Sequence, residues 1–253
     1  MRLEGSTCLV TGASRGIGRA IAAELADRGA RVLAGTREGS ADPPPQTTRV
    51  TMDLGSREAI DASCDELGDE LGGIDVLVNN AGSFAGGQLE TQDVASIYDV
   101  FQVNLVGLAD LTRRVLPTML ERRSGKLVNH SSIVGYLHFP GVTTYAASKA
   151  GVSAFTDSLR RELKGTGVTT MEIVTGGVDT DMLDRAAQSF EGQTESGGWQ
   201  WMDPAEWAHQ IVDGIERDKR VVGPPGRARV GKALASGPAF LVDALSGKGF
   251  ERG

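Results

Sequence analysis

Hydrophobic residues along the chain gather into short runs that are separated by longer amphipathic stretches. The first run, residues 6–11, is apolar almost throughout, which is typical of a strand buried on both faces of a parallel sheet. The pattern predicts strands at residues 6–11, 31–36, 47–52, 74–79, 126–132, 169–174 and 220–222. After the first strand we expect a helix on which Ile17, Ile21 and Leu25 recur at four-residue spacing and which Gly29 caps.

Strands and helices alternate along the sequence. Further helices are predicted at residues 56–71, 105–122, 145–163 and 204–217. Helical connections between parallel strands place helices on both faces of the sheet. The pattern therefore predicts a single α/β domain of residues 1–253, built on a Rossmann-type doubly wound parallel sheet of about seven strands.

A glycine-rich turn joins the first strand to the first helix. A helix N-terminus suits a pyrophosphate, because its N–H groups are unpaired and its dipole is positive there, and glycine lets the backbone come close. The spacing differs from the common Gly-x-Gly-x-x-Gly, and a plain strand-to-helix connection is the alternative. Its position between a strand and a helix favours dinucleotide binding. The predicted cofactor-binding residues here are Gly12, Ser14, Arg15, Gly16, Ile17 and Gly18.

The end of the second strand bears on the choice between NAD and NADP. An NAD enzyme normally carries an acid there for the ribose hydroxyls, but this chain has Thr36 followed by Arg37. Together with Arg15, this arrangement favours a 2′-phosphate, so NADP(H) is the preferred cofactor and NAD(H) remains possible. The alternative is that both arginines are solvated surface groups. After the third strand, Asp53 and Leu54 are expected to contact the adenine ring.

Tyr145 and Lys149 are the candidates for proton transfer. Residues four apart share one helix face, so the phenol and the ammonium project into the same pocket. A free tyrosine has a pKa of about 10, and a nearby cation is expected to lower it. Ser132, at the end of the fifth strand, supplies a hydroxyl beside the phenol. Taken alone, the Tyr-x-x-x-Lys spacing is a weak signal, because many helices contain it by chance.

Five motifs occur in one order and spacing, and together they carry a family resemblance. They are Thr11–Gly18, Asn79–Gly82, Asn104, Ser132 and Tyr145-x-x-x-Lys149. Over residues 6–182 the chain resembles a classical short-chain dehydrogenase/reductase. The resemblance implies that Asn104 supports a proton relay through water, although a solvated surface asparagine is the alternative. It also implies cofactor contacts from Asn80, Ala81, Gly82, Tyr145, Lys149, Val178 and Thr180.

The resemblance implies hydride transfer between a nicotinamide and a carbon atom of the substrate. We expect an NADP(H)-dependent oxidoreductase that interconverts a ketone or aldehyde and an alcohol, with Tyr145 as the acid in reduction and the base in oxidation. Residues 181–202 are expected to form a lid. Its Trp199 and Trp201, with Trp207 nearby, suggest an apolar substrate, and anchoring of the lid to the core is the equal alternative. Thr175 stands where the family has proline, which leaves the position of this loop less fixed.

Two other functions remain open. Residues 180–182, Thr-Asp-Met, resemble β-ketoacyl carrier-protein reductases, but the tail of residues 223–253 does not. A redox sensor that binds NADP without chemistry is the other alternative, and the intact Ser132, Tyr145 and Lys149 argue against it. The tail is expected to pack on a neighbouring subunit or on the lid, and a membrane-surface role is the weaker alternative.

Composition narrows the partners and the compartment. The net charge of −7 argues against nucleic acid as a ligand. Cys8 and Cys64 are expected to be structural thiols in a reducing cytosol, so a cytoplasmic location is predicted. The three histidines have neither ligand spacing nor an evident carboxylate partner, which predicts no metal. The family resemblance implies that the helices after Asn104 and around Gly151 pair across the interface of a homodimer or homotetramer.

Overall fold

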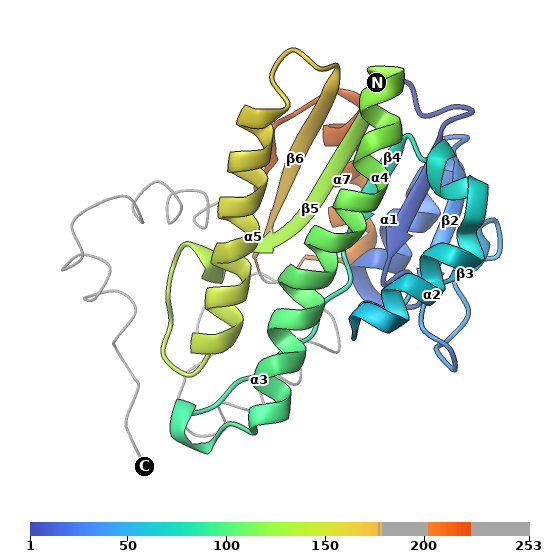
Figure 1. Cartoon of the computed structure of the whole chain (residues 1–253). Coiled ribbons are helices and arrows are strands. Elements are labelled where there is room, and N and C mark those ends of the chain that lie inside the picture. The colour runs from blue at the N-terminus through green and yellow to red at the C-terminus, as the bar shows by residue number, and fades with distance from the viewer. Residues whose placement is uncertain (177, 179–201, 224–253) are drawn as a thin grey trace.

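The computed structural model describes residues 1–176, 178 and 202–223, and these residues build one seven-stranded sheet (Figure 1). All adjacent strands pair in parallel, in the order β3-β2-β1-β4-β5-β6-β7. The chain order reverses between β1 and β4, as in a doubly wound sheet. The strands are β1 Thr7–Thr11, β2 Arg31–Thr36, β3 Thr48–Thr51, β4 Val76–Asn79, β5 Gly125–Ser132, β6 Val168–Thr175 and β7 Val221–Val222. The predicted fold class is confirmed.

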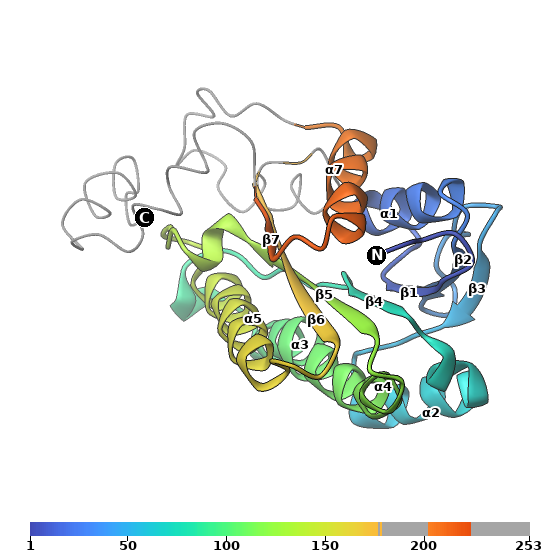
Figure 2. The same ribbon diagram turned by 90° about the horizontal axis from the view of Figure 1, so that it is seen from above.

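Helices cover both faces of the sheet, which gives three layers (Figure 2). One face carries α1 (Gly16–Asp27) and α7 (Pro204–Glu216). The other carries α2 (Arg57–Leu67), α3 (Val94–Phe101), α4 (Leu108–Arg122) and α5 (Thr143–Glu162). Short helical turns lie at Gly68–Gly73, Leu89–Thr91 and Ile133–Gly135. As predicted, Gly29 follows the end of α1 with a positive φ of 84° and donates its N–H to Ala26.

The two faces of the sheet bury two separate hydrophobic clusters. Successive strand residues point to opposite faces, so neighbours on β1 belong to different clusters. Cys8 and Val10 pack beneath α1 and α7, whereas Leu9 packs beneath α2 and α4. Both sides of the central strands are therefore covered, which explains why the sequence pattern of residues 6–11 is apolar throughout.

The helix that contains Asn104 differs from the prediction. It was expected to begin at residue 105, but helical structure runs continuously from Val94 to Arg122 through a π-helical segment, Gln102–Gly107. The Asp93 side chain caps its start by accepting from the Ser96 N–H at 2.9 Å. The beginning was missed because the first turns expose apolar residues, with Val94 at 63% and Tyr98 at 75% exposure, which hides the amphipathic pattern.

By length and mean hydropathy, this helix also resembles a membrane-spanning segment. Leu111, Val115 and Met119 are nevertheless fully buried in the cluster beneath β1, β4 and β5. Its inner half therefore has the packing of a core helix in a globular domain.

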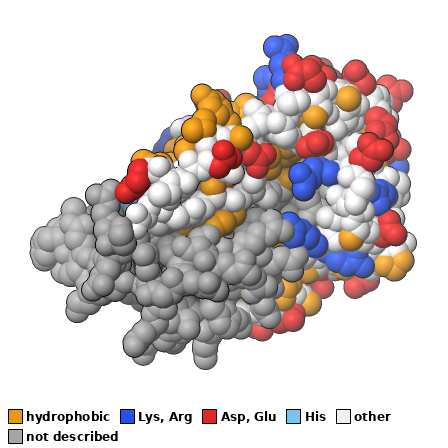
Figure 3. Space-filling model, turned by 90° about the horizontal axis from the view of Figure 1, so that it is seen from below, with side chains coloured by type: hydrophobic (Ala, Val, Ile, Leu, Met, Phe, Trp, Pro, Cys, Tyr) orange, Lys and Arg blue, Asp and Glu red, His pale blue; other side chains and the backbone are white. Residues whose placement is uncertain are grey.

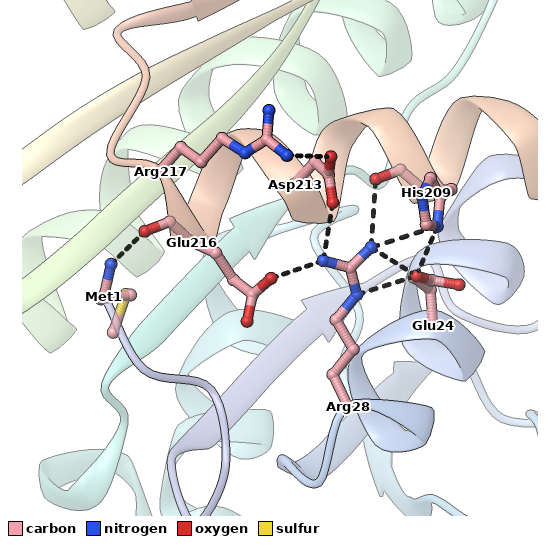
Figure 4. A network of polar contacts seen from close by, with 7 residues as sticks. All are labelled: Met1, Glu24, Arg28, His209, Asp213, Glu216 and Arg217. Atoms are coloured by element: carbon pink, nitrogen blue, oxygen red, sulfur yellow. Dashed lines mark hydrogen bonds and ion pairs between the residues drawn. The ribbon is translucent and has the colours of Figure 1, made fainter.

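The outer layer of α1 and α7 is joined by a network around Arg28 (Figure 4). The Arg28 guanidinium, 17% exposed, forms ion pairs with Glu24 at 2.6 Å, Asp213 at 2.8 Å and Glu216 at 2.5 Å. His209 lies 3.0 Å from Glu24, so the expectation that no histidine has a carboxylate partner was wrong. The partner comes from another helix, 185 residues away in sequence, which spacing does not reveal. Among the described residues no cluster of metal-ligand side chains forms.

Candidate active site

The predicted site residues meet at the carboxyl ends of β1, β4 and β5. The hydroxyl of Thr11, the last residue of β1, accepts the backbone N–H of Asn80 at 3.0 Å and of Ala81 at 2.9 Å. The Asn80 side chain in turn donates to the Thr11 carbonyl at 2.9 Å. These bonds fasten the Asn80–Gly82 turn to the start of the glycine-rich turn. Figure 3 looks onto this end of the molecule, where several Lys and Arg side chains gather.

Glycine is required in this turn by close packing. A Cβ on Gly18 would lie 2.2 Å from the Asn80 amide nitrogen and from the Gly12 carbonyl oxygen, and Gly12 has a φ of 69°. Gly16 also has a positive φ, 55°, at the first residue of α1. Most L side chains are strained at such angles, which glycine adopts freely.

The start of α1 fits a pyrophosphate. Its N-cap residue, Arg15, makes no side-chain cap, and the first turn contains no acidic residue. Backbone N–H groups and the positive end of the helix dipole therefore lie at the carboxyl edge of the sheet, with no carboxylate in the first turn of α1 to compete for them. The remaining residues predicted here, Ser14 and Ile17, are partly buried in the same turn.

The end of β2 carries the residues expected near the adenosine. Thr36 is 2% exposed, and its hydroxyl has no hydrogen-bond partner among the described residues. Arg15 and Arg37 are exposed. Asp53 accepts the Gly55 N–H at 2.9 Å. The Leu54 side chain is 3% exposed and packs in the core, where a Cβ on Gly107 would approach it to 2.8 Å. Its contact with the adenine stays a prediction.

Ser132, Tyr145 and Lys149 lie together, as the motif spacing predicts. Ser132 ends β5, Tyr145 is the third residue of α5, and their hydroxyl groups are hydrogen-bonded. The Lys149 ammonium lies 5.7 Å from the centre of the Tyr145 ring and donates to the His130 carbonyl at 2.8 Å. Phe84 packs edge-on against the tyrosine ring, with ring centres 5.1 Å apart.

Burial sets the proton affinities of these groups. It raises the pKa of Tyr145 to about 12, and the hydrogen bond from Ser132 offsets only part of this effect. It also lowers the pKa of Lys149 to about 8. The expected lowering of the tyrosine pKa by Lys149 is therefore wrong for the protein alone: desolvation of the phenolate outweighs the neighbouring charge. The four-residue spacing predicts proximity correctly but carries no information about burial.

Asn104 is buried and fully engaged, so the solvated-surface alternative is wrong. Its side-chain oxygen accepts the Ser83 N–H at 2.7 Å, and its amide nitrogen donates to the Ser83 carbonyl at 2.9 Å. The same nitrogen also donates to the Ser148 hydroxyl at 3.0 Å. Gly82 lies next to it, because a Cβ there would be 3.3 Å from the Asn104 oxygen and 3.8 Å from the Lys149 ammonium. The π-helical turn holds this amide toward Ser83 and Ser148.

The region after β6 is described only in part. Val178 is buried and pairs with Met202 in an isolated bridge. Thr180, the lid residues 181–201 and the tail residues 224–253 lie outside the described residues. Trp207 lies in the core at 1% exposure and donates to the Thr175 hydroxyl at 2.9 Å, so it anchors α7 and does not line a substrate pocket.

Two residues that matter at this site were not predicted. The His130 carbonyl holds Lys149, and its imidazole contacts the Thr175 hydroxyl at 2.5 Å. Thr175 is therefore held by side-chain bonds, contrary to the expectation that loss of proline leaves it less fixed. The one sequence signal was the departure from proline itself, since a contact between residues 45 positions apart is not visible in a pattern.

The chain belongs to the short-chain dehydrogenase/reductase family. The family model for short chain dehydrogenases matches residues 6–190. The chain is 40% identical over 220 residues to the 3-oxoacyl-(acyl-carrier-protein) reductase FabG of Vibrio harveyi, covering 84% of this chain and 90% of that one. It is 39% identical over 188 residues to the enzyme of the same name from Vibrio cholerae, covering 72% and 77%. The prediction of an oxidoreductase that acts on CH–OH groups is thereby confirmed.

Solved structures show the same fold. A short-chain dehydrogenase from Burkholderia cenocepacia in complex with NADP superposes with a TM-score of 0.81 at 24% identity, over 97% of this chain and 98% of that one. One from Sphingobium yanoikuyae in complex with NADPH has a TM-score of 0.74 at 25% identity, over 96% and 92%.

Proposed function

We propose that the protein is an NADPH-dependent 3-oxoacyl-(acyl-carrier-protein) reductase. The observation that carries this proposal is the 40% identity that extends over 90% of the Vibrio harveyi enzyme. This reverses the order of the predictions, in which an apolar ketone or aldehyde came first and the acyl thioester second. The aromatic residues that favoured a ketone give less support than expected, because Trp207 belongs to the core. A non-catalytic NADP sensor is disfavoured, because Ser132 and Tyr145 are hydrogen-bonded to each other and Lys149 lies beside the tyrosine ring.

The cofactor is NADP(H), as predicted from the end of β2. Thr36 offers a buried hydroxyl without a partner among the described residues. Arg37, the next residue, and Arg15 in the glycine-rich turn supply exposed positive charge. Solved relatives hold NADP and NADPH. The start of α1 receives the pyrophosphate, and the amide-binding role of Val178 and Thr180 is part of the same proposal.

The chemistry follows from the groups around Tyr145. When bound, NADPH would supply the hydride for the 3-oxo carbon of the substrate. As negative charge grows on the substrate oxygen, the hydroxyl of Ser132 donates to it, and Tyr145 donates its proton. A tyrosine with a raised pKa holds its proton firmly, so positive charge at the site is needed for the transfer. Lys149 provides that charge, and Asn104, with Ser148 beside it, holds the route by which the proton is replaced.

Substrate choice is tested with purified protein and NADPH. We expect consumption of NADPH with acetoacetyl or longer 3-oxoacyl carrier-protein thioesters at a kcat/KM at least about tenfold above that for unconjugated apolar ketones. Replacing the carrier protein with a short thiol separates recognition of the acyl chain from recognition of the carrier. A higher kcat/KM for simple ketones would overturn the acyl proposal and restore the original order.

The role of Tyr145 is tested by Tyr145→Phe, which keeps the ring against Phe84 and removes the proton. We expect kcat to fall by at least about 10³-fold, because the group proposed to give its proton to the substrate oxygen is removed. Binding of NADPH, followed by fluorescence, should change little. Turnover within a few-fold of the parent protein would exclude this mechanism.

We also propose that the single domain forms a homodimer or homotetramer in the cytoplasm. Val94, Tyr98 and Val106 expose apolar surface along the long helix, at 63%, 75% and 51%. Gly151 on α5 lies against this helix, because a Cβ there would be 2.8 Å from Leu105. Both cysteines are free and buried, which suits a reducing compartment. Light scattering of Tyr98→Glu against the parent protein tests the interface, and an unchanged mass would contradict it.

A further inference from the structure

A row of hydrogen bonds crosses the carboxyl edge of the sheet in the order of the strands. It begins at the Thr11 carbonyl on β1, passes through Asn80 after β4 and His130 on β5, and reaches Thr175 at the end of β6. Trp207 on α7 ends the row by donating its indole N–H to the Thr175 hydroxyl. The row therefore joins the glycine-rich turn at one end to the start of the post-β6 segment at the other.

The chemistry of the two ends fixes every proton in this row. A carbonyl only accepts, so Asn80 must turn its NH₂ group toward Thr11 and its oxygen toward His130, 2.9 Å away. His130 then donates through Nδ1 and accepts through Nε2, which lies 2.5 Å from the Thr175 oxygen. Thr175 donates to that nitrogen and accepts the Trp207 N–H, which is donor only. A single neutral tautomer of His130 satisfies all of these groups.

His130 stays in this neutral form at working pH. Burial, together with the positive charge of Lys149, lowers the pKa of His130 to about 3. Protonation would also turn both ring nitrogens into donors and break the contact with the Thr175 hydroxyl proton. The imidazole is thus a fixed connector and not a proton-transfer group.

The row touches the active site at two places. The Ser132 hydroxyl lies 3.4 Å from the Thr175 carbonyl, and the Lys149 ammonium is held by the His130 carbonyl. At the other end, Asn80 contacts the glycine-rich turn, where a Cβ on Gly12 would be 3.2 Å from the Asn80 amide nitrogen. A shift of the imidazole would therefore disturb both the cofactor-facing turn and the hydroxyl that contacts the substrate.

We propose that His130 is a positioning residue that orients Asn80 beside the cofactor and Thr175 beside Ser132 at the same time. In this role the imidazole and the Thr175 hydroxyl together replace the rigidity that a proline at position 175 would give. The proposal concerns the hydride-transfer site and holds whether the substrate is an acyl thioester or a simpler ketone.

Two substitutions of His130, each of which keeps one of its two side-chain hydrogen bonds and removes the other, test this role. His130→Asn keeps an amide N–H near the position of Nδ1 and loses the acceptor for Thr175. His130→Gln places an amide oxygen near Nε2 and loses the bond to Asn80. We expect His130→Asn to lower kcat about tenfold with nearly unchanged affinity for NADPH, and His130→Gln to weaken NADPH binding about tenfold, since one buried hydrogen bond is lost in each.

A second pair of variants on β6 provides a matched control. Thr175→Val removes a hydroxyl with two partners, whereas Thr170→Val removes a buried hydroxyl that has no partner among the described residues. We expect Thr175→Val to lower kcat about tenfold, as His130→Asn does, and Thr170→Val to leave kcat unchanged. The double variant His130→Asn/Thr175→Val should be no slower than either single one, because both break the same contact.

The dissociation constant of NADPH is measured by fluorescence without substrate, so this arm is independent of the acyl-reductase proposal. Melting temperatures are recorded alongside. Two results would overturn the proposal and make His130 a structural residue. One is an equal loss of kcat and of NADPH affinity in both His130 variants. The other is a fall in melting temperature while kcat and NADPH affinity stay at parent values. If the His130 variants do not fold, the comparison of Thr175→Val with Thr170→Val decides alone.

Discussion

Two lysines are buried at opposite ends of the sheet, and their surroundings differ in kind. Lys126, 1% exposed near the start of β5, is paired with the carboxylate of Asp218 and lies 3.4 Å from the Thr169 hydroxyl. Lys149, 5% exposed on α5, is held by the carbonyl of His130. One buried charge is neutralised by a partner and the other is held by a neutral dipole.

The pKa values of Asp218 and Lys149 reflect this difference. Burial opposes ionisation of Asp218, but the hydrogen bond and charge of Lys126 prevail, and its pKa is lowered. Burial lowers the pKa of Lys149 to about 8. At the amino end of the sheet, the ion pair between Lys126 and Asp218 stabilises the fold. At the carboxyl end, burial disfavours the charged form of Lys149 next to Tyr145. This difference supports the proposed role of Lys149 in proton transfer, which the chain would maintain at a cost to stability.

The largest expected effect is on activity at the carboxyl end. Lys149→Met fills similar volume without charge, and we expect kcat to fall by about 10³-fold or more, because the positive charge that would stabilise the phenolate formed as Tyr145 gives up its proton is lost. The free energy of unfolding should stay equal or rise, since an uncompensated buried charge is removed. Steady-state kinetics and urea unfolding measure both quantities. A strongly destabilised variant would show that Lys149 is a structural lysine after all.

At the amino end we expect the reverse. Asp218→Asn leaves the buried Lys126 ammonium without its counter-ion and should lower the free energy of unfolding by about 2–3 kcal/mol, with kcat unchanged. Asparagine tolerates the positive φ of 50° at this position, so backbone strain does not confuse the result. Urea unfolding at pH 7 provides the measurement, and a loss below about 0.5 kcal/mol would place this pair among ordinary surface ion pairs.

The pH dependence of stability sharpens the contrast. The folded-state pKa of Lys149, about 8, lies below its ordinary value of 10.5, so between these values the unfolded chain holds a proton that the folded protein has released. Stability from this group therefore rises with pH, and we expect a gain of about 2 kcal/mol between pH 7 and pH 10 in the parent protein relative to Lys149→Met. Parallel unfolding curves for the two proteins across this range would contradict the assignment.

The smallest effect is expected from the other partner of the amino-end pair. Lys126→Met leaves Asp218, whose side chain is 58% exposed, free to be solvated by water. We expect a loss of about 1 kcal/mol or less, smaller than that of Asp218→Asn. If the lysine variant is the more damaging of the two, packing of the lysine stem, and not its charge, dominates at this end.

The sequence was sufficient for the strands and for the motif residues. Parallel strands buried on both faces leave continuous apolar runs, and β2, Arg31–Thr36, begins and ends where the pattern predicts. The beginning of α3 was missed because Val94 and Tyr98 are apolar and exposed. The tyrosine pKa was predicted in the wrong direction because spacing indicates which groups meet but not how much water they lose. The His130–Thr175 contact depends on a register between β5 and β6 that only the folded sheet supplies.

The π-helical turn at Gln102–Gly107 has a consequence for how the chain tolerates insertions and deletions. A π-turn accommodates one residue more than an α-turn, so losing a single residue there would let the helix continue as a regular α-helix. The parts before and after the deletion would then keep nearly their present relative orientation, because the π-turn had absorbed the extra residue. Asn104 would turn away from Ser83 and Ser148, while α4 kept its packing on the sheet. A one-codon loss in this segment should thus abolish activity in a chain that still folds, whereas most other helix interiors would fail by unfolding.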